Sequence, residues 1–216
     1  MQKNIEVEVR GRLSDEKYEK LLAFMKENAE FLETKKRLLL DYSTFLPGEG
    51  VKERTRDIRL RITNGQPEII TKIGSWGGKE SRKELSINTE KGSFDTLVQN
   101  YAVLGYKKAI LAVRNTEVFQ YKNIEFALVE VPGHSYYFEA ERMAVSGEEE
   151  KIHEELRNVC EEIDLVLFDN EGFYAYIEEL NREANEVFEY KNHTEGYFDK
   201  YIGNHAEIEK QKLNRK

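Results

Sequence analysis

Acidic and basic side chains alternate with apolar ones in the first strand-like stretch of the chain, residues 5–13. The ionisable side chains on one side of this stretch are Glu6, Glu8, Arg10 and Arg12. Successive side chains of a strand leave opposite faces, so one face is charged and the other apolar. Carboxylates bind hard divalent cations, and guanidinium groups bind phosphate oxygens. The stretch therefore predicts either a solvated outer face or an enclosed face that binds a metal and an anion.

Three later stretches repeat this alternation. Their ionisable residues are Arg59 and Arg61, Arg82 and Glu84, and Glu139 and Glu141. Together the four stretches fit a sheet whose polar face closes on itself, so that charged groups converge. Like charges about 4 Å apart repel by roughly 4 kcal/mol at an effective dielectric near 20, so converging arginines require interleaved carboxylates or a bound polyanion.

These residue types indicate phosphoryl chemistry. The natural oxygen ligands for Mg²⁺ or Mn²⁺ are the carboxylates of Glu6, Glu8, Glu139 and Glu141. The planar fork of arginine suits phosphate oxygens.

Helices that could cover the apolar faces follow from the pattern. The predicted helices span residues 15–29, 94–104, 152–163 and 172–190, and Ser14 is placed to cap the first of them. The predicted strands span residues 5–13, 38–42, 58–62, 69–73, 82–87, 109–120, 124–131 and 136–141. Asn64-Gly65 predicts a type I′ hairpin between the third and fourth of these strands.

Composition limits the class of protein. The 216 residues fit one domain or one domain with an appendage, and 34% of them are charged. A net charge of -8 argues against a general nucleic-acid coat. The single cysteine, Cys160, excludes an internal disulfide and is expected to be a buried thiol. Without a long apolar run or a signal-like start, we expect a cytoplasmic protein without a membrane partner.

Two further motifs carry no predicted chemistry. Gly77-Gly78-Lys79 lacks the phosphate-loop spacing because Glu80 stands where serine or threonine is needed. The histidines show no metal-ligand spacing.

The charged residues, taken in chain order, resemble a known family. Glu6-x-Glu8-x-Arg10 is similar to the ExExK signature that opens CYTH domains, the triphosphate tunnel metalloenzymes. The similarity continues through Arg59-x-Arg61, Lys72, Arg82-x-Glu84, Arg114 and Glu139-x-Glu141, and it includes residues 104–106, 128–131 and 174–180. It covers about residues 3–182. Arg10 replaces the lysine of the signature, Ala112 stands where a lysine often precedes Arg114, and Ser86 occupies a position that is frequently acidic.

The resemblance implies an α+β fold in which an eight-stranded antiparallel β-barrel forms a tunnel with a polar lumen, flanked by helices. We expect this domain to span residues 1–182, and we expect residues 183–216 to form a charged, helical C-terminal extension. The resemblance also implies a divalent cation, Mg²⁺ or Mn²⁺, and a small molecule that carries a triphosphate.

The resemblance assigns roles to individual residues. The implied metal ligands are Glu6, Glu8, Glu130, Glu139 and Glu141. The implied substrate-binding residues are Arg10, Arg12, Arg59, Arg61, Lys72, Arg82 and Arg114. The implied catalytic residues are Arg10, Lys72 and Glu84.

Three functions remain open at this point. The favoured one is metal-dependent hydrolysis of inorganic tripolyphosphate, thiamine triphosphate or a nucleotide. The second is a class IV adenylyl cyclase that converts ATP to cyclic AMP, and the third is a non-catalytic polyphosphate or nucleotide binder. The tyrosines of the C-terminal region, Tyr174 to Tyr201, are expected to pack internally or to form a homodimer surface.

Overall fold

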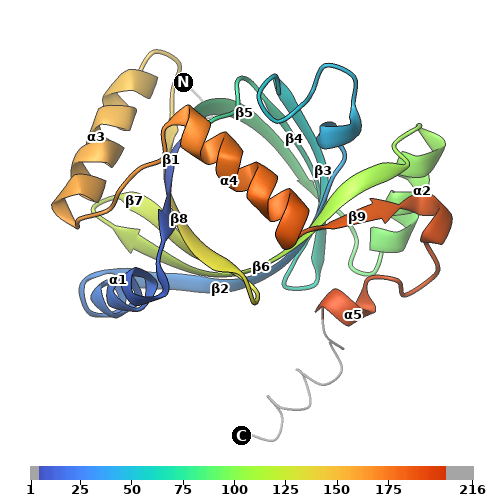
Figure 1. Cartoon of the computed structure of the whole chain (residues 1–216), viewed down its shortest axis with the longest axis horizontal. Helices are drawn as coiled ribbons and strands as arrows, with labels where there is room; N and C mark the ends of the chain where they lie inside the picture. The colour runs from blue at the N-terminus through green and yellow to red at the C-terminus, as the bar shows by residue number, and fades with distance from the viewer. Residues whose placement is uncertain (1–4, 203–216) are drawn as a thin grey trace, which may run out of the picture.

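The computed structural model describes residues 5–202, which form a sheet of β-strands surrounded by helices (Figure 1). The strands are β1 (Ile5–Leu13), β2 (Glu30–Asp41), β3 (Arg56–Thr63), β4 (Gln66–Ile73), β5 (Lys79–Asn88), β6 (Lys108–Tyr121), β7 (Ile124–Val131), β8 (Ser135–Ala144) and β9 (Glu186–Glu189). The helices are α1 (Asp15–Asn28), α2 (Phe94–Val103), α3 (Glu149–Glu162), α4 (Asn170–Glu183) and α5 (Asp199–Ile202), with short 3₁₀ turns η1 (Ser43–Phe45) and η2 (Tyr190–Asn192).

Backbone hydrogen bonds close strands β1 to β8 into a ring. The order of neighbours is β2-β3-β4-β5-β1-β8-β7-β6, and β2 pairs with β6 as well. Each pairing is antiparallel. This ring confirms the eight antiparallel strands that the sequence predicts.

The predicted hairpin has the expected turn. Asn64 and Gly65 have φ angles of 49° and 83°, and they connect the paired residues Thr63 and Gln66. Positive φ at both central residues is the requirement of a type I′ turn, which matches the twist of the flanking strands.

The apolar faces of β1, β7 and β8 point out of the ring and are covered by α1 and α3. Val7, Leu128 and Phe138 are fully buried in this cluster, which also contains Met25 of α1 and Cys160 of α3. The prediction that Cys160 is a buried thiol is confirmed. Each large apolar side chain removed from water stabilises the fold by about 1.5–3 kcal/mol, so this packing keeps the charged faces of the same strands inside the ring.

A second apolar cluster joins the opposite side of the ring to the C-terminal region. Leu40 and Leu60 of the ring pack with Val98 of α2, and Phe188 and Phe198 from the C-terminal region complete the cluster. In Figure 1 this region lies beside α2, at the edge of the ring.

The C-terminal region differs from the predicted helix. The predicted helix over residues 172–190 ends at Glu183, and Glu186–Glu189 forms β9 instead. The reason is the long strand β6, which pairs with β7 only from Asn115 onward and so leaves an edge at residues 108–111 that β9 fills. Residues 203–216 of the predicted extension lie outside the described residues.

β2 is longer than predicted. The sequence pattern predicts a strand at residues 38–42, whereas β2 begins at Glu30 and pairs with β6 over most of its length. No helix among residues 5–202 combines the length and the apolar composition that crossing a membrane requires.

The segment that leads into α4 crosses β1 at Gly11. The backbone N–H of Phe168 donates to the carbonyl of Arg10 at 2.8 Å. A Cβ atom on Gly11 would lie 2.0 Å from the carbonyl oxygen of Val166 and 2.6 Å from the ring of Phe138. Glycine therefore permits the close crossing that places α4 over one end of the ring (Figure 1).

We expect Gly11→Ala to lower the free energy of unfolding by about 1–3 kcal/mol, because the new methyl group must displace backbone. At this chain length the melting temperature should fall by several degrees, measured by circular dichroism. Gly50→Ala is the control, since its Cβ would meet only the flexible carboxylate of Glu53. A Gly11→Ala variant as stable as the wild type would contradict the close crossing.

His153 ties α3 to the ring and should make stability depend on pH. Its Nε2 lies 2.9 Å from the hydroxyl of Ser81 on β5, and burial together with nearby Lys79 lowers the pKa of His153 to about 4. Because the folded state binds this proton less readily than the unfolded state, stability should fall as pH drops from about 6.5 to 4. In denaturant titrations, His153→Gln should show a smaller loss over that window than the wild type. Equal losses would show that His153 does not contribute.

Candidate active site: a charged cavity inside the ring

The inside of the ring contains a cavity of about 290 Å³ that is lined mainly by ionisable side chains. The residues that line it are Glu6, Glu8, Arg10, Lys35, Arg37, Leu39, Arg59, Arg61, Lys72, Glu84, Arg114, Thr116, Glu125, Ala127, Val129, Tyr137, Glu139 and Glu141. The structure therefore brings together most of the charged residues that the sequence singles out.

Acidic and basic residues occupy opposite walls of this cavity. β1 and β8 contribute its acidic wall, Glu6, Glu8, Glu139 and Glu141. β2 and β3 contribute its basic wall, Lys35, Arg37, Arg59 and Arg61. In the ring, β4 and β5 separate these two pairs of strands on one side, and β7 and β6 separate them on the other. The two walls therefore face each other across the cavity.

The acidic wall holds a tight group of carboxylates. One carboxylate oxygen from each of Glu6, Glu8 and Glu141 lies within 4.8 Å of the other two. Burial and the neighbouring Glu6 raise the pKa of Glu141 to about 8. Burial, despite Arg10, also raises the pKa of Glu8 well above its usual value. Carboxylates crowded in this way favour a proton or a divalent cation among them.

Lys72 offsets part of this negative charge. Its ammonium group on β4 contacts the carboxylate of Glu6 and lies 3.1 Å from that of Glu84. Although burial acts in the opposite direction, Lys72 brings the pKa of Glu6 to about 2. Burial lowers the pKa of the Lys72 ammonium group, but the carboxylates around it outweigh this effect and hold that pKa above its usual value. Lys72 is therefore a permanent cation at neutral pH.

Arg10 is held among three carboxylates. Its guanidinium donates to Glu8 at 2.6 Å, to Glu139 at 3.2 Å and to Glu80. It also lies over the ring of Phe173 on α4, 5.0 Å from the centroid. These carboxylates raise the pKa of Arg10 against the effect of burial, so its charge and its orientation are both fixed.

Each arginine of the basic wall has fewer carboxylate partners than Arg10: Arg59 contacts Asp57, Arg61 contacts Glu68, and Arg37 pairs with no carboxylate among residues 5–202. Arg61 donates to Glu68 at 2.5 Å, but burial and the like charge of Arg37 lower the pKa of its guanidinium. Next to this wall, Arg114 on β6 donates to Asn185 at 2.9 Å and not to a carboxylate. The positive potential of such a wall attracts an anion.

Arg82, a predicted substrate-binding residue, does not line the cavity. It is 1% exposed and is enclosed by Asp57 at 2.5 Å and Glu80 at 2.6 Å. Asp57 continues the network to Arg54 at 3.1 Å and to Arg59. Arg82 thus anchors Asp57, which in turn holds Arg59 of the basic wall.

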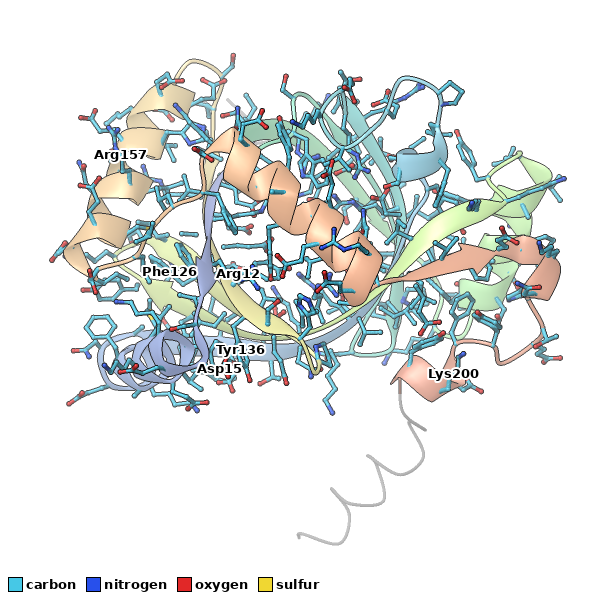
Figure 2. All side chains as sticks on the ribbon, viewed as in Figure 1. Arg12, Asp15, Phe126, Tyr136, Arg157 and Lys200 are labelled. Atoms are coloured by element: carbon cyan, nitrogen blue, oxygen red, sulfur yellow. The ribbon has the colours of Figure 1, made fainter. Side chains whose placement is uncertain are left out.

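Two other predicted site residues lie outside the cavity. Arg12, labelled in Figure 2, is 46% exposed and donates to both carboxylate oxygens of Glu179 on α4, at 2.8 and 2.9 Å. Glu130 has the opposite parity from Val129, which lines the cavity, and it accepts a hydrogen bond from Asn115 at 2.9 Å. The structure brings neither residue to the carboxylate group of the acidic wall.

Several residues of the site were not predicted from the sequence. Lys35 and Arg37 belong to the part of β2 that was not predicted. They lie on the opposite face of the strand from the buried Leu38 and Leu40. Glu125 stands on β7 at 3.4 Å from Lys35. Glu80 precedes the predicted strand 82–87, but it lies on β5 and is a buried partner of Arg10.

One further group of potential ligand atoms lies outside the cavity, within the described residues. It consists of His134, Glu179 and Glu183. Because Arg12 occupies both oxygens of Glu179, this group is explained as an ion-pair cluster that holds α4 to the turn before β8.

No protein-family model and no curated protein matches the sequence. Solved structures do match the fold. PH1819 from Pyrococcus horikoshii OT3 has a TM-score of 0.68 at 20% identity, over 82% of this chain and 99% of that one. A Vibrio parahaemolyticus protein, provisionally described as an adenylate cyclase, has a TM-score of 0.59 at 18% identity, over 76% and 91%.

A third structure comes from a plant. The Hippeastrum protein HpAC1, described as having a dominant triphosphatase activity, has a TM-score of 0.54 at 15% identity, over 83% of this chain and 95% of that one. At these identities the likeness concerns the fold. The chain has the fold of CYTH-type proteins, as the order of its charged residues predicts.

Proposed function

We propose that this chain is a member of the CYTH family that binds a small molecule carrying a triphosphate in the cavity and hydrolyses it with a divalent cation. The observation that carries the proposal is the pair of opposed walls, one with four carboxylates and one with four cationic side chains. A metal–triphosphate complex carries a cation that fits the acidic wall and an anion that fits the basic wall. The activity described for HpAC1 adds support.

The carboxylate group of the acidic wall fits a divalent cation. Glu6, Glu8 and Glu141 are the residues that would hold it, because their oxygens converge and because Mg²⁺ and Mn²⁺ prefer such hard ligands. When bound, the cation would supply charge stabilisation to phosphate oxygens. Glu139, which donors such as Arg10 keep ionised against the effect of burial, adds negative charge beside this group.

The basic wall would bind the phosphates. Arg37, Arg59 and Arg61 face the carboxylates and can donate to phosphate oxygens from fixed positions. In hydrolysis, water attacks the terminal phosphorus and the bond to the bridging oxygen breaks, which releases orthophosphate. Negative charge develops on the phosphate oxygens, and guanidinium groups placed beforehand stabilise that charge.

Adenylyl cyclisation is the second candidate, because the Vibrio neighbour is provisionally described as a cyclase. The ribose 3′-oxygen of ATP would attack the α-phosphorus in the same cavity and release pyrophosphate. A product screen over tripolyphosphate, thiamine triphosphate and nucleotides with Mg²⁺ and Mn²⁺ separates the candidates. Orthophosphate supports hydrolysis, cyclic AMP with pyrophosphate supports cyclisation, and binding without product indicates a non-catalytic binder.

Glu141→Gln should lower metal-dependent phosphate release by about 100-fold, since it removes one carboxylate from the proposed ligand set. Calorimetric titration with Mn²⁺ alone should show a matching loss of affinity. The control is Glu130→Gln, the same change on the neighbouring strand but outside the cavity, and it should alter neither measurement by more than about twofold. Equal effects of the two substitutions would argue against the assignment of the metal site.

Tripolyphosphate at about 100 times its Kd should stabilise the wild type by roughly 2.7 kcal/mol in denaturant titrations. Arg61→Gln should remove most of this increment, because Arg61 belongs to the basic wall. Arg12→Gln should keep it, because Arg12 pairs with Glu179 outside the cavity. The proposal would be in error if the Arg12 variant lost the increment and the Arg61 variant kept it.

A further inference from the structure

A smaller chamber of about 140 Å³ lies between the charged cavity and α4. The chamber continues the cavity, because six residues line both spaces: Arg10, Leu39, Arg59, Arg114, Tyr137 and Glu139. A ligand whose phosphates contact Arg59 would therefore have its remaining part beside this chamber.

The far side of the chamber is apolar, unlike the cavity. Ile110 and Ala112 contribute aliphatic groups from the ring, and Ile177 and Leu180 contribute them from α4. The only tryptophan of the chain, Trp76, also lines it. Inorganic tripolyphosphate is charged along its whole length and would gain nothing from these walls, whereas a planar organic ring would gain from leaving water.

Polar groups at the chamber provide points for hydrogen bonding. Asn181 accepts from Asn185 at 2.9 Å, and its own amide N–H groups donate to no partner among residues 5–202. Thr44 and Asp41 lie on the chamber wall as well. An apolar space with a few convergent polar groups is typical of sites for heterocycles.

The size of the chamber suits one ring. An apolar cavity of about 150 Å³ in a protein core is large enough for a benzene ring, and closely packed interiors do not usually keep a space of this size empty. We propose that the chamber binds a single planar heterocycle of pyrimidine size, so that the substrate is an organic triphosphate and not inorganic tripolyphosphate. This inference rests on the proposed triphosphate site.

Cytidine triphosphate and tripolyphosphate are the probes, titrated in EDTA so that metal-dependent turnover is absent. Calorimetry should show binding of cytidine triphosphate at least about tenfold tighter than tripolyphosphate. The nucleotide should also quench the emission of Trp76, which reports on the chamber directly, while tripolyphosphate should not. Tripolyphosphate binding as tightly as the nucleotide, or a nucleotide that leaves Trp76 unchanged, would overturn the inference.

Ala112→Phe places a ring in the chamber from β6, and Ile177→Trp fills it from α4 if the first variant does not fold. Either should weaken the nucleotide by at least about tenfold and tripolyphosphate by less than about threefold. The matched control is Ala175→Phe, on the exposed face of α4, which should change neither affinity. Equal weakening of both probes, or of neither, would refute the ring site.

The proposed function fails in a different way. If cytidine triphosphate binds and quenches Trp76 but no phosphate or cyclic product appears with metal, the ring site stands and hydrolysis is excluded. If phosphate is released from tripolyphosphate with unchanged efficiency in Ala112→Phe, and the wild type prefers it to the nucleotide, hydrolysis stands and the ring site is excluded.

Discussion

Opposite charges on facing walls are the constraint on which the rest of this structure depends. An ionised side chain loses several kcal/mol of hydration when it is buried, and it remains ionised only where partners or ligands replace the water. Arg10 finds three carboxylates, and Asp57 finds Arg82, Arg54 and Arg59. The carboxylates of the acidic wall remain crowded, and Arg37 of the basic wall pairs with no carboxylate among residues 5–202. This residual imbalance of charge defines the binding site.

The fold places this charge inside the ring by covering the apolar outer faces of most of its strands, although Leu85 and Ile87 on the outer face of β5 remain exposed. α1 and α3 cover β1, β7 and β8, while α2 and the C-terminal region cover the opposite side. α4 has a different role, because it lies across an end of the ring and lines the chamber there. Its position depends on the crossing over β1, which Gly11 permits, and on the ion pair between Arg12 and Glu179. α4 thus adds apolar side chains at one end of the charged cavity.

Alternation in the sequence predicts which face of a strand a residue occupies, but it does not predict what covers that face. It placed Glu6, Arg59 and Glu139 correctly on the inside, because their apolar neighbours are unambiguous. It gave no parity for β7, where Ala127 and Val129 line the cavity while Leu128 faces the core, and so Glu130 was assigned from resemblance alone. Arg82 lies on the inward side of β5, yet it is buried against Asp57 of β3 and does not reach the cavity. No local sequence pattern predicts this contact between two strands. β9 forms because β6 extends beyond its pairing with β7, and that too is a property of the assembled sheet.

The most direct test of the opposed walls is anomalous diffraction from crystals soaked with Mn²⁺ and tripolyphosphate. The account predicts a manganese peak among the carboxylates of Glu6, Glu8 and Glu141, with phosphate density between that peak and Arg59 and Arg61. Manganese at His134 and Glu183 instead, or phosphate on the outer surface of the ring, would contradict it.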